Sequence, residues 1–201
     1  MKLYFSPGAC SLAVHIALHE AGLKADAVKV DLRSHTLADG TNYYDISPRG
    51  YVPLLELDDG SRHSEASALL QYVADQVPEA GLIGEVRSLR RLEVTKWVGF
   101  ISTELHKTFG PLWNPATLDA VRAQTLDRLA TRLKDVNAHL ATTSYLAGDY
   151  SIADAYAFTV INWANFLSIP LADYPHIQDY MARIAARPAV QAALAAEGLN
   201  K

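Results

Sequence analysis

The chain of 201 residues contains a single cysteine, Cys10. One cysteine cannot form an internal disulfide or a Cys-x-x-Cys redox pair, and with seven dispersed histidines it cannot complete a thiolate zinc site. We therefore expect no metal. The absence of disulfides is typical of a reducing compartment, so we expect the protein in the cytoplasm.

Clusters of basic residues are also absent. The formal net charge is −4, and Lys and Arg are scattered along the chain. Nothing in this pattern supplies the phosphate-neutralising patch that nucleic acid requires, so we expect no nucleic-acid partner.

Long uninterrupted apolar runs are missing as well. The N-terminal SLAVHIAL follows Pro7 and Gly8 and contains His15, so we expect no signal peptide. The apolar-rich SIADAYAFTVINWANFLSIPLA carries Asp154 and Pro170, which are costly in hydrocarbon. We therefore expect no membrane span and no membrane partner.

The first eighty residues alternate between strand and helix patterns. Expected elements are strand 2–5, helix 11–22, strand 27–31, a short helix in the polar stretch that follows, a hairpin over 51–63 and helix 64–78. Asp59-Gly60 is a strong signal for the hairpin turn. This order favours a small mixed sheet with helices on its faces.

Strand signals stop after the loop-like PEAGLIGE, and from Arg87 the pattern is helical. Leu126, Leu129, Leu133, Val136 and Leu140 repeat at 3,4,3,4 spacing, which predicts one apolar stripe. Further on, Ser151 and Asp154 form a capping-box pattern. We expect two domains, 1–80 and 87–201.

Cys10 lies at the start of the first predicted helix, in SPGACSL. Unpaired N–H groups and the helix dipole favour a thiolate there, which predicts a reactive thiol. The alternative is that Cys10 is a small buried apolar residue, and its local sequence leaves both interpretations open.

Two other short motifs are candidates for ligand binding. Val52-Pro53 directly precedes a strand, where a cis bond would present the Val52 amide and carbonyl to a ligand. In SEAS, Glu65 offers a carboxylate beside the helix N–H groups of Ala66 and Ser67, a pair suited to the ammonium and carboxylate of an amino acid. Alternatively, Ser64 or Glu65 merely caps the helix.

Two predicted helices carry histidines that are candidates for catalysis or metal binding. Gly99, Thr103 and His106 share one face of a helix that ends or kinks at Gly110-Pro111, which makes His106 a candidate proton carrier or donor, with Lys107 beside it. The alternative is an ordinary surface or core histidine. His15 and His19 are four residues apart, but no third ligand completes a metal site.

The motifs SPGACSL, RGYVPLLEL, SEASALLQY, TELHKTFGPLW and SIADAY together resemble the cytosolic glutathione S-transferases of the bacterial beta class. The resemblance covers nearly the whole chain, and Cys10 with His106 is its most class-specific combination. It implies an α+β, thioredoxin-like N-terminal domain that binds glutathione as co-substrate. An all-α C-terminal domain would supply most of the pocket for a hydrophobic electrophile, and the protein would form a homodimer.

The resemblance also assigns residues to glutathione. Val52, before Pro53, would pair its backbone with the cysteinyl unit, and Glu65 and Ala66 would take the γ-glutamyl head. Catalysis would fall to Cys10 and His106, with Thr103 also at the glutathione site. For the electrophile, the apolar candidates are Phe5, Phe109, Leu112, Trp113, Trp163 and Phe166, none of them assigned firmly.

Two positions depart from the pattern of the family. His35 stands where beta-class members commonly carry Lys for the glycyl carboxylate, which predicts weaker and pH-dependent glutathione affinity. Gly99 replaces an Asn that commonly reaches glutathione across the dimer interface, so that contact is not expected here.

Two routes remain open for the chemistry. A Cys10 thiol can donate an S–H hydrogen bond to the glutathione thiolate, which with the helix N-terminus lowers the pKa of the bound thiol and readies it for conjugation. A Cys10 thiolate can instead attack a disulfide that contains glutathione. Thioltransferase, dehalogenase or peroxidase side activity is compatible with either route. The alternative outside catalysis is a transferase-fold binding module in transcription, translation or stress regulation.

Overall fold

The computed structural model describes residues 1–200. Contacts divide the chain into two compact units, Met1–Leu82 together with the segment that starts at Arg187, and Ile83–Ala186. The first unit contains the sheet and the second is helical, as the expected α+β and all-α domains require. The sequence predicts a second domain over 87–201, whereas the contacts group residues 187–200 with the first unit.

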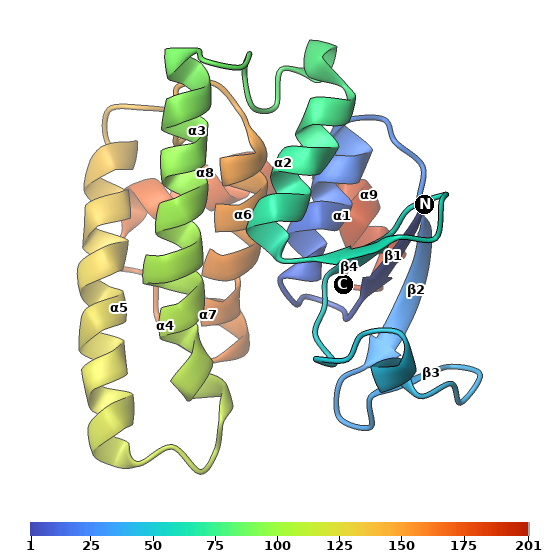
Figure 1. Ribbon diagram of the computed structural model, residues 1–201. Coiled ribbons are helices and arrows are strands. Elements are labelled where there is room, and N and C mark those ends of the chain that lie inside the picture. The colour runs from blue at the N-terminus through green and yellow to red at the C-terminus, as the bar shows by residue number, and fades with distance from the viewer. Residues whose placement is uncertain (201) are drawn as a thin grey trace. The chain divides into compact units, whose positions relative to one another are not determined.

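The first unit is built on a five-stranded mixed sheet (Figure 1). Its strand order is β3-β2-β1-β4-β5, with β1 parallel to β2 and the other pairs antiparallel. The strands are β1 Lys2–Phe5, β2 Asp26–Asp31, β3 Thr36–Leu37, β4 Leu54–Glu56 and β5 Arg62–Ser64. The predicted hairpin is confirmed, and Gly60 in its turn has φ +82°.

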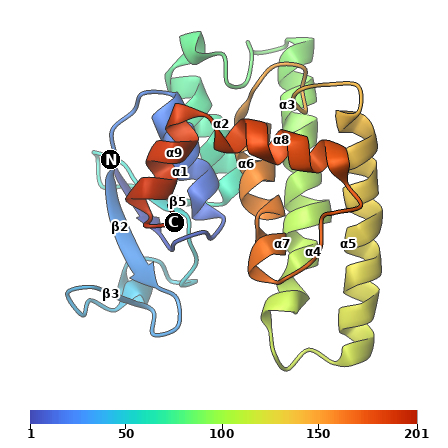
Figure 2. The ribbon, with the colours of Figure 1, turned by 180° about the vertical axis from the view of Figure 1, so that it is seen from behind.

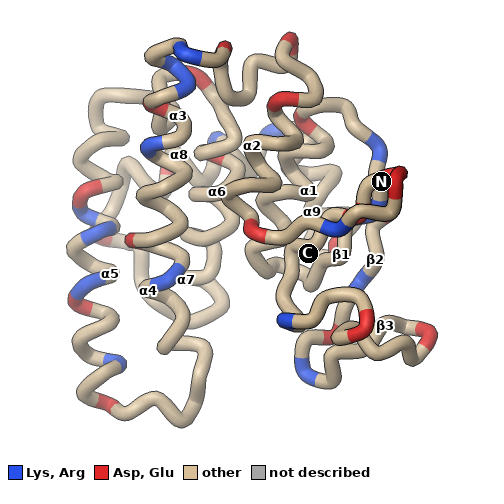
Figure 3. Tube along the Cα trace, viewed as in Figure 1, with Lys and Arg blue, Asp and Glu red and all other residues tan. Residues whose placement is uncertain are grey.

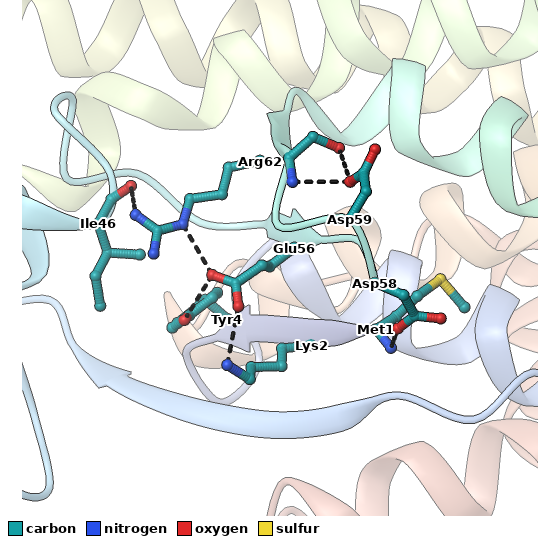
Figure 4. A network of polar contacts seen from close by, with 9 residues as sticks. Met1, Lys2, Tyr4, Ile46, Glu56, Asp58, Asp59 and Arg62 are labelled. Atoms are coloured by element: carbon teal, nitrogen blue, oxygen red, sulfur yellow. Dashed lines mark hydrogen bonds and ion pairs between the residues drawn. The ribbon is translucent and has the colours of Figure 1, made fainter.

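Glu56 ties three of these strands together (Figure 4). Its carboxylate accepts hydrogen bonds from Lys2 Nζ at 2.9 Å and from Arg62 Nε at 2.8 Å. These donors lower the pKa of Glu56 from 4.5 to about 2, because they stabilise the ionised form.

The helical elements of this unit are α1 Ser11–Glu20, η1 Tyr43–Asp45, α2 Ala66–Gln76, η2 Pro78–Ala80 and α9 Pro188–Ala196. Residues 11–18 of α1 are all buried, because the helix packs against both α2 and α9. Figure 2 shows α9 beside α1 from behind. This packing is why the C-terminal segment belongs to the first unit.

The second unit is helical. It contains α3 Leu89–Phe100, η3 Ile101–His106, α4 Lys107–Phe109, η4 Gly110–Trp113, α5 Asp119–Leu140, α6 Ile152–Ile161, α7 Trp163–Phe166 and α8 Pro175–Ala185. Basic and acidic positions are interspersed along α5 (Figure 3).

The apolar stripe of α5 is largely as predicted. Leu129, Leu133, Val136 and Leu140 are buried, whereas Leu126 is 37% exposed. The stripe therefore begins one turn later than the spacing indicated, since the first turns of α5 project beyond the buried core.

The predicted capping box at the start of α6 is confirmed. Ser151 caps the helix, and the buried Asp154 accepts from the Ser151 N–H at 2.8 Å and the Leu146 N–H at 2.9 Å. All residues of α6 are buried, so this cap fixes the start of the central helix of the unit.

Among residues 1–200, no helix is both long enough and apolar enough to cross a membrane.

Candidate functional site

Cys10 is the residue that immediately precedes α1, and its side chain is partly exposed. The segment before it turns tightly: Gly8 has φ +72°, and the Ala9 N–H donates to the Ser6 carbonyl at 3.0 Å. Cys10 Sγ lies 3.2 Å from the carbonyl oxygen of Val52, which is the acceptor of a thiol hydrogen bond. Donation to a carbonyl favours the thiol over the thiolate.

The Val52-Pro53 peptide bond is cis, as the sequence analysis proposed. Val52 is buried within a cluster formed with Tyr4, Val30, Tyr43 and Leu54. The structure therefore brings together two predicted features, the Cys10 thiol and the Val52 carbonyl, that lie 42 residues apart in the sequence.

Glu65 directly precedes α2 in an unusual backbone conformation, φ 72° and ψ 107°. Its side chain makes no capping hydrogen bond, so the alternative that Glu65 caps the helix with its carboxylate is excluded. The carboxylate is largely exposed and lies 3.5 Å from the guanidinium of Arg49. The next residue, Ala66, is buried at the N-terminus of the helix, where the first N–H groups have no partner within the helix.

His35 has φ 51° and lies against Tyr44, with 4.5 Å between ring centroids. Its Nδ1 is buried and, among the described residues, has no hydrogen-bond partner. Gly50 is required here, because a Cβ at that position would lie 2.7 Å from His35 Nδ1. The His35 ring is thus held close to the backbone of Gly50.

A buried carboxylate supports the Cys10 segment from the far end of the chain. Glu197 accepts from the Gly8 N–H at 2.9 Å and lies 3.0 Å from His15 Nδ1, and its side chain is fully buried. Glu197 was not predicted as a functional residue, because its contact with Gly8 spans 189 positions and leaves no local signal in the sequence. It also explains His15, whose partner is Glu197 rather than a metal.

In the second unit, His106 is the last residue of η3. Its Nδ1 lies 2.7 Å from the hydroxyl of the buried Tyr156, and its ring meets Trp163 edge to face at 4.9 Å between centroids. Burial, with the positive charge of Lys107 adding to it, lowers the pKa of His106 from 6.5 to about 4. The imidazole is therefore neutral at pH 7.

The helix that carries His106 differs from the expected one. Residues 101–106 form a π-helix, with its wider turn, so the 3.6-residue spacing that placed Gly99, Thr103 and His106 on one face does not hold. Thr103 and Gly99 are exposed, and the Thr103 hydroxyl donates to the Gly99 carbonyl at 3.0 Å. The helical path does change at Gly110, where η4 begins.

The aromatic candidates separate into distinct groups. Trp163 meets Phe109 at 5.6 Å and Trp113 at 5.8 Å, so these rings form a cluster next to His106. Phe109, Leu112 and Trp163 are buried, and Trp113 and Phe166 are 45% and 50% exposed. Phe5 instead lies in the first unit, where it contacts His15.

Among residues 1–200, no group of three or more His, Cys, Asp or Glu side chains is placed to hold a metal ion. His15 and His19 stack on each other at 5.2 Å.

Comparisons with known proteins agree with this arrangement. Residues 7–76 match the family model of the glutathione S-transferase N-terminal domain, and residues 100–188 match that of the C-terminal domain. Glutathione S-transferase GstA of Escherichia coli O157:H7 is 44% identical over the full length of both chains.

Solved structures give the same result. The ternary complex of BphK, a bacterial GST, is 48% identical, with a TM-score of 0.96 over 99% of this chain and 100% of that one. The bacterial beta-class glutathione S-transferase of Sphingomonas chungbukensis is 40% identical, with a TM-score of 0.95 over 100% of both chains. With both family models and full-length relatives in agreement, the chain belongs to the glutathione S-transferase family, in its bacterial beta class.

Proposed function

We propose that Cys10 acts as a thiol donor in glutathione conjugation, the reaction of this enzyme family. The observation that carries the proposal is the 3.2 Å approach of Cys10 Sγ to the Val52 carbonyl, which favours a protonated Cys10. Two neighbouring thiolates would repel each other, so a Cys10 that keeps its proton allows the glutathione sulfur to lose its own.

In this mechanism, glutathione enters as the thiol and releases its proton to solvent. The Cys10 S–H then turns from the Val52 carbonyl and donates its hydrogen bond to the resulting thiolate, which attacks the electrophilic carbon. The new carbon–sulfur bond forms as the bond to the leaving group breaks, and the leaving group departs with the electron pair of that bond. Cys10 ends the cycle unchanged, as a thiol.

The groups around Cys10 support binding of glutathione. We assign the Val52 backbone, ahead of Pro53, to the cysteinyl unit, and Glu65 with the Ala66 N–H to the ammonium and carboxylate of the γ-glutamyl head. The exposed carboxylate of Glu65 is available to an ammonium that displaces Arg49, since a surface ion pair of this kind is weak.

The remaining assignments concern the other polar positions. We assign His35 to the glycyl carboxylate, where a neutral imidazole can donate one hydrogen bond from Nε2. Thr103 is assigned to glutathione as well, through its exposed position near the start of η3. At Gly99 a Cβ would meet no atom within 4 Å, so an Asn would fit there.

We assign the electrophile to the aromatic cluster around His106. Phe109, Trp113 and Trp163 offer apolar ring faces and edges beside one polar group, which is the usual composition of a small-molecule site. Trp113 is 45% exposed, so this ring of the cluster is accessible to an apolar ligand.

A second activity, thiol–disulfide exchange, is proposed for the same cysteine. A Cys10 thiolate would attack the glutathione sulfur of a mixed disulfide, form a new disulfide with it and release the other thiol. A second glutathione thiolate would then restore Cys10 and leave as oxidised glutathione. This route requires reduced glutathione, which is consistent with a cytoplasmic enzyme.

We propose a homodimer that buries the N-terminal part of α3. Leu89 and Leu92 are three residues apart on this helix and are 80% and 60% exposed, and Val86 just before it is 74% exposed. Three exposed aliphatic side chains at this spacing form an apolar patch that a second copy can cover. A Leu89→Glu variant should shift the molecular mass measured by light scattering from dimer to monomer. An unchanged dimer would move the interface elsewhere.

The function is tested by glutathione binding and turnover of the purified protein. We expect retention on glutathione-agarose and conjugation of 1-chloro-2,4-dinitrobenzene, followed by the absorbance of the product. A protein that neither binds glutathione nor turns over would instead favour the non-catalytic binding module.

A further inference from the structure

The contact between His106 and Tyr156 determines which chemistry His106 can perform. A neutral imidazole carries its proton on only one nitrogen, and the hydrogen bond made by one nitrogen decides the state of the other. If Nδ1 accepts a hydrogen bond, Nε2 carries the proton and is a donor. If Nδ1 donates, Nε2 has a bare lone pair and is a base.

The chemistry of the pair favours acceptance by Nδ1. The two atoms are 2.7 Å apart, a typical length for a hydrogen bond from a hydroxyl. A phenol hydroxyl is a good donor and a weak acceptor, because its oxygen lone pair is delocalised into the ring. The unprotonated imidazole nitrogen is a strong acceptor, so the favoured arrangement is Tyr156 O–H donating to His106 Nδ1.

The surroundings keep this arrangement fixed. Tyr156 is on α6, whose residues are all buried and whose start is held by the Ser151–Asp154 capping box. The ring of His106 is also packed edge to face against Trp163 on α7. A flip of the ring by half a turn would put a carbon in place of Nδ1 and lose the hydrogen bond.

Burial of the imidazole and the positive charge of Lys107 oppose the protonation of His106. Lys107 follows His106 directly, and its positive charge repels an imidazolium. Helix α7, Trp163–Phe166, contains no side chain that ionises. On α6, the carboxylate of Asp154 is occupied by the Ser151 and Leu146 N–H groups and by the Tyr180 hydroxyl. The histidine therefore stays neutral near pH 7.

We propose that Tyr156 is a positioning residue that holds His106 as the neutral Nε2–H tautomer, so that His106 serves the reaction as a hydrogen-bond donor and not as a general base. This inference rests on the catalytic role that the family resemblance implies for His106. The Nε2–H would stabilise negative charge on a thiolate or on a departing group, and the proton of the glutathione thiol would leave to solvent without passing through His106.

The tautomer can be measured directly in the ligand-free protein labelled with ¹⁵N-histidine, by long-range ¹H–¹⁵N correlation. We expect His106 to show an unprotonated Nδ1 and a protonated Nε2, unchanged from pH 6 to pH 9. A protonated Nδ1, or an imidazolium within this range, would overturn the proposal whether or not the protein is catalytic.

The Tyr156→Phe variant tests the positioning role. We expect His106 to lose its single tautomeric state, and kcat for conjugation to fall about tenfold, the equivalent of one hydrogen bond, while KM for glutathione stays within about twofold. Tyr174→Phe is the matched control, since Tyr174 is a buried tyrosine that bonds the Ala130 carbonyl and lies apart from His106. An unchanged tautomer or an unchanged kcat in Tyr156→Phe would contradict the inference.

A second pair of variants covers the case in which Tyr156→Phe does not fold. His106→Gln keeps a neutral N–H donor at the end of the side chain, whereas His106→Leu has none. We expect Gln to retain a kcat about tenfold above that of Leu. Equal kcat values for the two would exclude a donor role, and wild-type kcat in both would remove His106 from the proposed mechanism altogether.

Discussion

Asp154 lies at the start of α6, and its buried carboxylate is the acceptor of several hydrogen bonds in the second unit. It accepts hydrogen bonds from two backbone N–H groups, those of Leu146 and Ser151, and from the hydroxyls of Ser151 and Tyr180, at 2.8 to 3.0 Å. The Asp154 side chain is fully buried, so water cannot replace it. Substitution by Ala would therefore leave these donors without their acceptor.

The size of the effect follows from these contacts. Each buried donor left without a partner costs about 1–3 kcal/mol, and the two hydroxyls can rotate toward other acceptors. The two N–H groups cannot, so we expect Asp154→Ala to lower the free energy of unfolding by about 4 kcal/mol. An ordinary domain has a stability of about 5–15 kcal/mol, so this is a loss of about a quarter to four fifths.

The assay is urea unfolding followed by circular dichroism and tryptophan fluorescence, with the midpoint and slope compared between variants. Asp154→Asn keeps one acceptor oxygen and should fall between Ala and wild type. Asp149→Ala is the matched control, since Asp149 is nearby but 91% exposed, with only a 3.5 Å ion pair to Arg90. A loss below about 1 kcal/mol for Asp154→Ala would show that the capping box is not the anchor of this unit.

Three further predictions concern the first unit. Because the pKa of Glu56 is lowered to about 2, its ionised form stabilises the fold above pH 4.5, and this contribution disappears as the pH falls toward 2. The difference in melting temperature between wild type and Glu56→Gln should therefore shrink over that window. A constant difference would contradict this prediction. Glu197→Ala should cost about 3 kcal/mol in urea unfolding, because it leaves a buried His15 and the Gly8 N–H without their partner; a neutral effect would mean that the C-terminal segment does not support the Cys10 turn. His35→Lys should lower KM for glutathione by about tenfold at pH 8, where a lysine is charged and an imidazole is mostly neutral, and an unchanged KM would remove the glycyl carboxylate from this position.

The fold was predictable wherever the signal is local. Alternation in KLYF and AVKVD, the Asp59-Gly60 turn and the Ser151–Asp154 capping box each specify a structure through neighbouring residues, and each prediction is confirmed. The placement of the last helix was not predictable in this way. Its packing on α1 depends on Glu197 reaching His15 and Gly8, and no spacing rule relates residues so far apart.

For the site, local motifs named Cys10, Val52-Pro53, Glu65 and His106 as candidates, and the resemblance assigned roles to them. The predicted cis bond is present, and Cys10 contacts the Val52 carbonyl, whereas the roles stay predictions. The π-helix at 101–106 was missed, because its extra residue per turn leaves no periodic signal over six residues. The partner of His106, Tyr156, was missed because it is 50 positions away and looks like core.

The central claim, that Cys10 donates a hydrogen bond in conjugation and attacks only in disulfide exchange, is tested most directly by measuring both activities in Cys10→Ala. The account predicts that exchange with a mixed disulfide of glutathione falls to background, whereas conjugation of 1-chloro-2,4-dinitrobenzene falls only about tenfold, the loss of one hydrogen bond. Equal retention, or equal loss, of the two activities would contradict it.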